Sequence, residues 1–318
     1  MSGPLRIDDF AESVQRSPPA EHLVELTPSR DSRVGETTVR RALPTRQRRT
    51  VGAWCFLDHA PERLVEGGPG LNIGPHPHIG LQTVTWLLDG EVVHRDSLGS
   101  EQLITPGQLN QMSAGRGVVH AEETPRRYRG TLHGVQLWVA QPERTRHDVA
   151  AFEHHAELPS VDLPTATVTV MVGALMGVES PARRDTDLVG IDVALRPGRT
   201  VLPVEPSYEH AIVVLAGTAA IDDRVVPADQ LGYLGSGRAD IAITVTTPTR
   251  ALVVGGEPFE AQPLMWWNFV ARDRDEIDAA YEDWQSGSER FGTVTSSLDL
   301  VPAPPPLWRS SGRPFRRR

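Results

Sequence analysis

The amino-acid sequence predicts an all-β protein of two barrel-like domains packed together, with one short helix near the C-terminal end. Short apolar runs recur along most of the chain and are separated by turn dipeptides. Glycine and proline make up 28 and 27 of the 318 residues, a share that favours turns and short strands over long helices. Part of the pattern also recurs in the second half, which indicates two copies of one β-domain.

The first domain is expected over residues 31–145, after a polar arm of residues 1–30 that packs irregularly. Its clearest element is the segment 83–94, in which two β-rich runs flank the dipeptide Asp89-Gly90. This dipeptide between two such runs is a strong hairpin signal. Many short strands at close spacing are typical of a β-sandwich or barrel.

The second domain is expected over residues 165–290, with a polar connection around residues 145–165. The segment 83–90 resembles the segment 211–217, and Gln108-Leu109 resembles Gln230-Leu231 at a similar distance further on. Repeats of this size indicate two copies of one β-domain.

A single helix is predicted between residues 273 and 287. Asp273 is placed to accept a hydrogen bond from the backbone near Glu276, as a helix N-cap does. The apolar residues that follow lie on one stripe, which is expected to pack on the second barrel: Ile277, Tyr281 and Trp284. The segment 300–318, rich in proline and arginine, is expected to be disordered.

Composition excludes several classes of function. The chain contains no lysine, so all 32 basic residues are arginines; Schiff-base, pyridoxal phosphate and Walker-type phosphate chemistry all need a lysine. The net charge of −9 argues against direct nucleic-acid binding. No apolar run is long enough for a membrane helix, so no membrane association is expected. The only cysteine, Cys55, fits a reducing compartment, and the protein is expected in the cytoplasm.

Two short motifs carry the chemistry. His76 and His78 form a His-x-His pair, and His120 and Glu122 form a His-x-Glu pair that begins 42 residues after His78. In a strand, residues two apart point to the same face. Two such strands side by side would bring three imidazoles and one carboxylate together, a donor set that suits several divalent metals and leaves positions open for substrate.

The remaining histidines are interpreted as structural or exposed. His94, His133 and His210 lie in or beside apolar runs and are expected to be hydrogen-bonded structural histidines. His59 follows an apolar run and could lie near a site, but no local partner for it is evident.

Residues 75–123 resemble the metal-binding half of the pirin family, and the segment 130–140 resembles the stretch that follows in that family. The resemblance implies two cupin barrels, that is, double-stranded β-helix or jelly-roll domains. It assigns His76, His78, His120 and Glu122 as metal ligands. Many cupins carry a ligating carboxylate where this chain has Gln82, so Glu122 must supply the negative charge. The second cupin lacks the matching residues and is expected to be degenerate, without a metal.

The resemblance implies one divalent metal in the first cupin, Fe(II) first, with Mn, Ni, Cu or Zn as alternatives. It implies a dioxygenase that opens a flavonol such as quercetin, or a related aromatic or enol substrate, with dioxygen as co-substrate and Glu122 as the catalytic base. The alternative is a metal-dependent binding or co-regulator protein with a protein partner and no physiological turnover. Four apolar residues are candidates for the substrate-binding wall: Phe56, Ile73, Met112 and Leu137.

Overall fold

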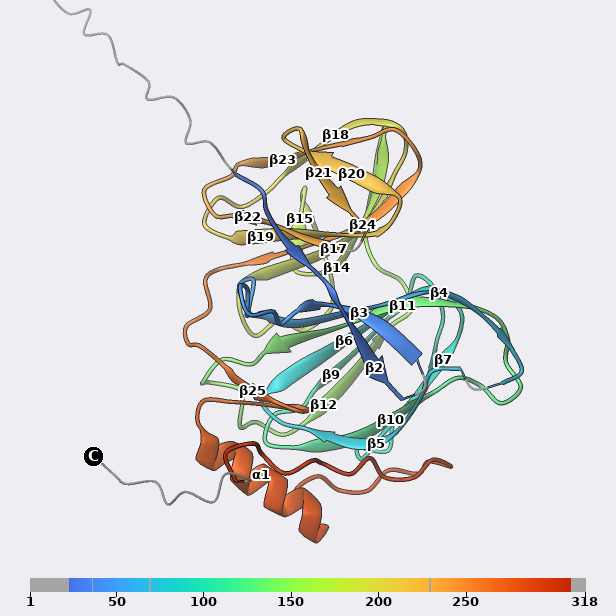
Figure 1. Cartoon of the computed structure of the whole chain (residues 1–318), viewed down its shortest axis with the longest axis vertical. Coiled ribbons are helices and arrows are strands. Elements are labelled where there is room, and N and C mark those ends of the chain that lie inside the picture. The colour runs from blue at the N-terminus through green and yellow to red at the C-terminus, as the bar shows by residue number, and fades with distance from the viewer. Residues whose placement is uncertain (1–22, 36, 69, 229, 310–318) are drawn as a thin grey trace, which may run out of the picture.

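The computed structural model describes residues 23–309 except residues 36, 69 and 229 (Figure 1). Within this part the chain forms antiparallel sheets and one α-helix, and each of two domains combines a seven-stranded sheet with a four-stranded sheet. The prediction of an all-β protein with two barrel-like domains and a short helix is confirmed. The helix has 13 residues and is too short and polar to cross a bilayer, and no other described helix could do so.

The predicted hairpin on Asp89-Gly90 does not form in the first domain. The strands on either side of this turn, β6 (Leu81–Asp89) and β7 (Val92–Asp96), lie in different sheets and pair with other strands, so the turn connects the two sheets instead. The domain's seven-stranded sheet runs, in spatial order, β12 (Ala151–His155), β9 (Leu109–Ser113), β6 (Leu81–Asp89), β11 (Arg129–Ala140), β4 (Trp54–Glu66), β3 (Thr37–Leu43) and β2 (Arg30–Val34). Its four-stranded sheet runs β5 (Asn72–His78), β10 (Val118–Glu123), β7 (Val92–Asp96) and β8 (Glu101–Ile104).

The second domain repeats this arrangement. Its seven-stranded sheet runs β1 (Glu25–Pro28), β22 (Gln230–Gly235), β19 (Glu209–Ala216), β24 (Thr249–Gly256), β17 (Leu188–Leu195), β14 (Ala166–Val172) and β13 (Ser160–Leu163). Its four-stranded sheet runs β18 (Gly198–Pro203), β23 (Asp240–Val245), β20 (Thr218–Ile221) and β21 (Arg224–Pro227). Two small hairpins, β15 (Ala174–Leu175) with β16 (Val178–Glu179) and β25 (Leu264–Trp266) with β26 (Phe269–Ala271), complete the described strands.

The domains pack through the outer faces of their larger sheets. One continuous apolar cluster joins Leu57 and Leu137 of the first domain to Val213 and Leu252 of the second. Burying such side chains against each other removes apolar surface from water and favours association. The indole of Trp86 crosses the interface and donates a hydrogen bond to the buried carboxylate of Asp192 (2.9 Å).

Two segments that were expected to be an irregular arm and a connection between the domains contain strands. Residues 25–28 of the predicted irregular arm form β1, which pairs with β22 at the edge of the second domain's sheet. Residues 151–155 of the predicted connection form β12, which pairs with β9 at the corresponding edge of the first. Both segments are short and polar, so their strand pairing depends on partners far away in the sequence.

The helix packs on the first domain and not, as expected, on the second. Helix α1 (Arg274–Ser286) begins after the predicted N-cap Asp273, whose side chain accepts from Glu276 N. Figure 1 shows it at the end of the molecule opposite the second domain, beside β5 and β10. Its buried Ile277 lies in one apolar cluster with Ile79 and Val119 of the first domain. The stripe therefore predicts an apolar face correctly but not which domain it covers.

The segment after the helix is ordered as far as residue 309, contrary to the expectation of disorder from residue 300. The indole of Trp284 donates to Val301 O (3.2 Å), and the indole of Trp308 donates to Asp278 Oδ1 (3.0 Å). The backbone of Val301 also donates to Pro75 O beside the His-x-His motif (2.9 Å). The rest of the predicted disordered tail lies outside the described residues.

Candidate metal centre

Three histidines meet between neighbouring strands of the four-stranded sheet. In the antiparallel pairing of β5 with β10, His120 lies opposite His76, and Val118 lies opposite His78. All three imidazoles are buried, and their ligand nitrogens lie within 4.8 Å of one another. The i, i+2 spacing of the His-x-His motif thus places both side chains on the face shared with His120.

The protons on the first two rings are directed away from the cluster. His76 Nδ1 lies 2.8 Å from Gly74 O, and His78 Nδ1 lies 2.9 Å from Asn268 O. A carbonyl oxygen only accepts, so each Nδ1 carries the hydrogen and each Nε2 keeps its lone pair. Fixing the outer nitrogen in this way is the usual support of a metal-binding histidine.

The spacing of the inner nitrogens fits a metal. His78 Nε2 and His120 Nε2 are 3.0 Å apart. Two nitrogen ligands each about 2.1 Å from one cation, at right angles, are separated by about 3.0 Å. Two lone pairs at this distance repel each other unless a proton or a cation lies between them, so the pair is a fitting site for a divalent ion.

Burial keeps these side chains in the form that binds metal. Desolvation lowers the pKa of His76 to about 4, and desolvation together with the neighbouring His76 holds the pKa values of His78 and His120 well below their ordinary range. The rings are therefore neutral at pH 7 and available as ligands.

Glu122 lies two residues after His120 on β10, and its side chain is buried. Burial raises the pKa of its carboxyl group. Its Oε1 accepts a hydrogen bond from the hydroxyl of Thr85 (3.2 Å). The carboxylate groups with His120 and His94 within 4.8 Å, whereas the three-histidine group does not include it. The structure thus places Glu122 beside His120, and a divalent cation there would supply the positive charge that the buried carboxylate lacks.

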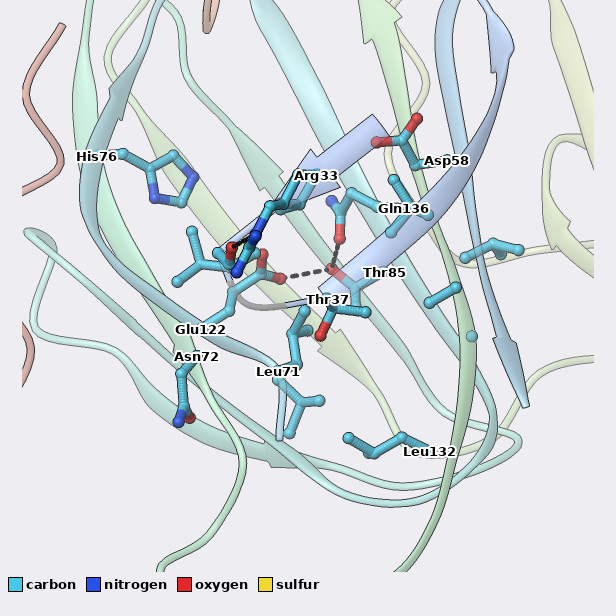
Figure 2. A pocket seen from close by; sticks show the side chains of 18 of the residues that line it. Arg33, Thr37, Asp58, Leu71, Asn72, His76, Thr85, Glu122, Leu132 and Gln136 are labelled. Carbon is cyan, nitrogen blue, oxygen red and sulfur yellow. Dashed lines mark hydrogen bonds between the residues drawn. The ribbon is translucent and has the colours of Figure 1, made fainter. Parts of the chain in front are cut away.

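The cluster opens into a cavity of about 450 Å³ in the first domain. His76, Glu122 and Thr85 lie on its wall in Figure 2. Phe56 and Trp138 stack at 3.9 Å with an interplanar angle of 12° and form part of the apolar lining. A cavity of this size and polarity is typical of a small-molecule site.

Two of the four predicted wall residues line this cavity and two do not. Phe56 and Ile73 lie on its wall. Leu137 is instead buried in the cluster between the domains, because side chains alternate along β11 and its neighbours Gln136 and Trp138 face the cavity. Met112 packs in a separate apolar cluster.

Gln82 is not among the residues that line the cavity, and its amide donates to Ser113 Oγ (2.9 Å).

Two neighbours of the site were missed or only partly identified from the sequence. His94, expected to be structural, is hydrogen-bonded as predicted, but its Nδ1 lies 3.4 Å from His120 Nδ1. The sequence signal for His94 is its His-x-Asp spacing with Asp96, which equals the spacing in the His-x-His and His-x-Glu motifs. Gln136 carries no local signal at all; Thr85 Oγ1 lies 3.0 Å from its Oε1.

The isolated His59 does find a partner in the structure. Its Nε2 lies 2.9 Å from Nε2 of His133, on the strand that pairs with its own. Neither histidine belongs to a group of three candidate ligands among the described residues. His59 itself does not line the cavity, but its partner His133 does, so His59 lies beside the cavity, as the sequence allowed.

Comparison with known proteins agrees with this architecture. The sequence model of the Pirin family matches residues 36–139, and that of the Pirin C-terminal cupin domain matches residues 190–292. A Pseudomonas aeruginosa protein with the provisional name of quercetin 2,3-dioxygenase is 42% identical over 292 residues, which cover 91% of this chain and 92% of that protein. A pirin-like protein of Caulobacter vibrioides is 34% identical, over 85% of this chain and 96% of its own length.

A solved structure has the same fold as this chain. The crystal structure of a quercetin 2,3-dioxygenase from Acinetobacter baumannii superposes with a TM-score of 0.86 at 40% identity, and covers 93% of this chain and 97% of its own. Both barrels are therefore cupins, as the resemblance implied. With two family matches, these relatives and a His-rich centre in the first cupin, the chain belongs to the pirin family.

Proposed function

We propose that the protein is a metal-dependent dioxygenase that opens a flavonol, or a related aromatic or enol substrate, at His76, His78, His120 and Glu122. The observation that carries the proposal is the buried cluster of neutral imidazoles beside a buried carboxylate, at one end of an apolar-walled cavity. The names of the relatives support the same class of reaction. The chemistry would take place in the cytoplasm, where the buried Cys55 needs no disulfide partner.

The four residues would hold one divalent ion, Fe(II) in our proposal. A bound cation of this kind would stabilise the anion of the substrate and bring it together with dioxygen. The histidines contribute no charge, so Glu122 sets the charge of the ligand set. A divalent ion held by these residues would keep a net positive charge, which would favour binding of an enolate or phenolate oxygen.

Glu122 would act as the base for the substrate hydroxyl. The hydroxyl of Thr85 donates to Oε1, which fixes the carboxylate and leaves Oε2 to receive the proton. Burial raises the pKa of this carboxyl group, so it accepts a proton more readily than an exposed glutamate does. The same group would hold the proton until the product is released.

The cavity would orient a flat substrate and exclude water. The ring of Phe56 lies between Trp138 and the guanidinium of Arg41, whose carbon is 4.5 Å from the ring centroid. Asp58 holds Arg41 through two hydrogen bonds of 2.7 Å. This stack gives the cavity a rigid aromatic wall against which a planar molecule can pack.

The test combines metal content with turnover. Untagged protein is analysed by elemental mass spectrometry, and quercetin is added without oxygen and then with it. We expect about one equivalent of metal and turnover that starts only with oxygen. Metal without turnover of quercetin or related enols would favour the alternative of a binding protein, and absence of metal after reconstitution would refute the centre.

A pair of neighbouring glutamates tests the base. Glu122→Gln should retain part of the metal and lower turnover by about 10²–10⁴-fold, the usual contribution of a general base. Glu123→Gln is the matched control. Glu123 does not line the cavity, and its Oε1 accepts a hydrogen bond from the hydroxyl of Ser296 (2.6 Å), so this variant should keep wild-type turnover. A Glu122→Gln variant with the wild-type rate would show that another group takes the proton.

A further inference from the structure

We propose that His94 and Asp96 form a positioning relay that fixes the hydrogen of the metal ligand His120 and thereby tunes the strength of metal binding. The inference rests on the metal centre of the proposed function but not on its substrate or its turnover. His94 lies opposite Glu122, and Asp96 lies opposite His120, in the pairing of β7 with β10.

The relay begins at a carboxylate that is fixed by the backbone. Asp96 Oδ1 accepts hydrogen bonds from the backbone N–H groups of Leu98 (2.9 Å) and Ser100 (3.1 Å) in the turn after β7. Its Oδ2 lies 3.0 Å from His94 Nε2. An ionised carboxylate only accepts hydrogen bonds, so Nε2 of His94 carries the hydrogen between them.

The hydrogen bond between Asp96 and His94 also determines which nitrogen of His120 carries the hydrogen. A His120 that binds metal through Nε2 carries its hydrogen on Nδ1, so at the contact between the two rings Nδ1 of His94 is the acceptor. This Nδ1 lies 3.4 Å from His120 Nδ1, so the hydrogen at this long contact belongs to His120. His120 then has its Nε2 lone pair directed at the other two ligands, 3.0 Å from His78 Nε2.

The ring of His94 is held in one plane. Phe152 of β12 stacks on it with 4.4 Å between ring centroids and an interplanar angle of 11°. His94 is 3% exposed, so no bulk water competes for its nitrogens. Both ends of the relay are therefore rigid, as is required of a group that supports a ligand.

This support differs from that of the other two ligands. Gly74 O and Asn268 O, which accept from His76 and His78, are neutral backbone groups. His120 alone among the three is supported by a side chain that is itself bonded to a carboxylate. A carboxylate at the end of such a chain increases the basicity of the ligating imidazole, so His120 should be the strongest donor of the three.

Asp96→Asn is the sharpest test, because it changes the hydrogens and almost nothing else. The Asn side chain can keep its oxygen on the two backbone N–H groups and then presents N–H to His94 Nε2. His94 must then carry its hydrogen on Nδ1, facing His120, and His120 is driven to place its own on Nε2. We expect Ni(II) and Co(II) to bind about 10–100-fold more weakly, as is typical for loss of such a partner.

The variants His94→Asn and His94→Phe separate the relay from simple packing. The Asn oxygen takes the place of Nδ1 and can accept from His120, whereas Phe keeps the ring and the stack on Phe152 without an acceptor. His94→Asn should therefore bind metal more tightly than His94→Phe. This pair decides the question if Asp96→Asn does not fold, which circular dichroism of the metal-free protein will show.

The control is a second His-x-carboxylate pair with the same spacing. Glu153 Oε2 lies 3.2 Å from His155 Nε2 on β12, and neither residue belongs to a candidate ligand group among the described residues. Glu153→Gln should leave metal binding unchanged.

Metal affinity is measured by competition with a chelator, and the visible absorption spectrum of the Co(II) form reports on the ligand field. We expect Asp96→Asn and His94→Phe to weaken binding and shift the Co(II) bands. Binding within twofold of wild type with an unchanged spectrum, in both variants, would overturn the relay. A wild-type protein that takes up no metal would instead refute the proposed centre, so the two failures are distinguishable.

Discussion

Replacing Ile277 by alanine tests whether helix α1 is an integral part of the first domain. The side chain is fully buried and packs with Ile79, Val119 and Phe269. The substitution removes three carbon atoms, worth about 0.8 kcal/mol each in transfer free energy. The cavity left behind adds to this sum, so we expect the free energy of unfolding to fall by about 3–4 kcal/mol.

Urea unfolding followed by tryptophan fluorescence measures this loss directly, because four tryptophans lie in the same cluster as Ile277: Trp266, Trp267, Trp284 and Trp308. Val225→Ala is the control, since Val225 is 54% exposed and should change stability by less than about 0.5 kcal/mol. A loss below about 1 kcal/mol for Ile277→Ala would refute the docking of the helix on the first domain.

Two further predictions concern the histidines. His76→Ala should abolish metal binding while the far-UV circular dichroism spectrum stays that of a folded β-protein, because His76 borders the cavity; loss of the fold would show that the site is structural. Metal-free protein should lose stability as the pH falls from 6.5 towards 4. Burial lowers the pKa of His76 to about 4 and that of His59 to about 3. The unfolded chain therefore binds more protons in this range, and each such histidine contributes about 1.4 kcal/mol per pH unit. A flat profile of unfolding free energy against pH would contradict the buried neutral state.

Much of the geometry of the candidate metal centre could be predicted because its information is local. The spacing within His-x-His and His-x-Glu fixes which face of a strand the side chains occupy, whatever the rest of the fold. Only the pairing of β5 with β10 was needed to bring the motifs together. The same rule applied to His94 and Asp96 would have found them, had their spacing been compared with that of the other motifs.

The parts that could not be predicted depend on distant segments. The carbonyl of Asn268, which supports His78, comes from 190 residues further along the chain. The apolar stripe of α1 fits any apolar surface, so periodicity cannot choose between two similar barrels. Leu137 was misassigned for a related reason. A strand that is apolar on both faces, one against a cavity and one against a second domain, has no alternation from which to read its orientation.

Asn268, whose carbonyl supports His78, is translated long after the first cupin. A ribosome adds about 5–20 residues per second, so the 190 residues between His78 and Asn268 take roughly 10–40 s to synthesise. During this interval the nascent first cupin has the three candidate ligand histidines but lacks the segment that supports one of them and covers Ile79 and Val119. The candidate centre is therefore unfinished until the chain is almost fully translated, although the domain that contains it is translated first.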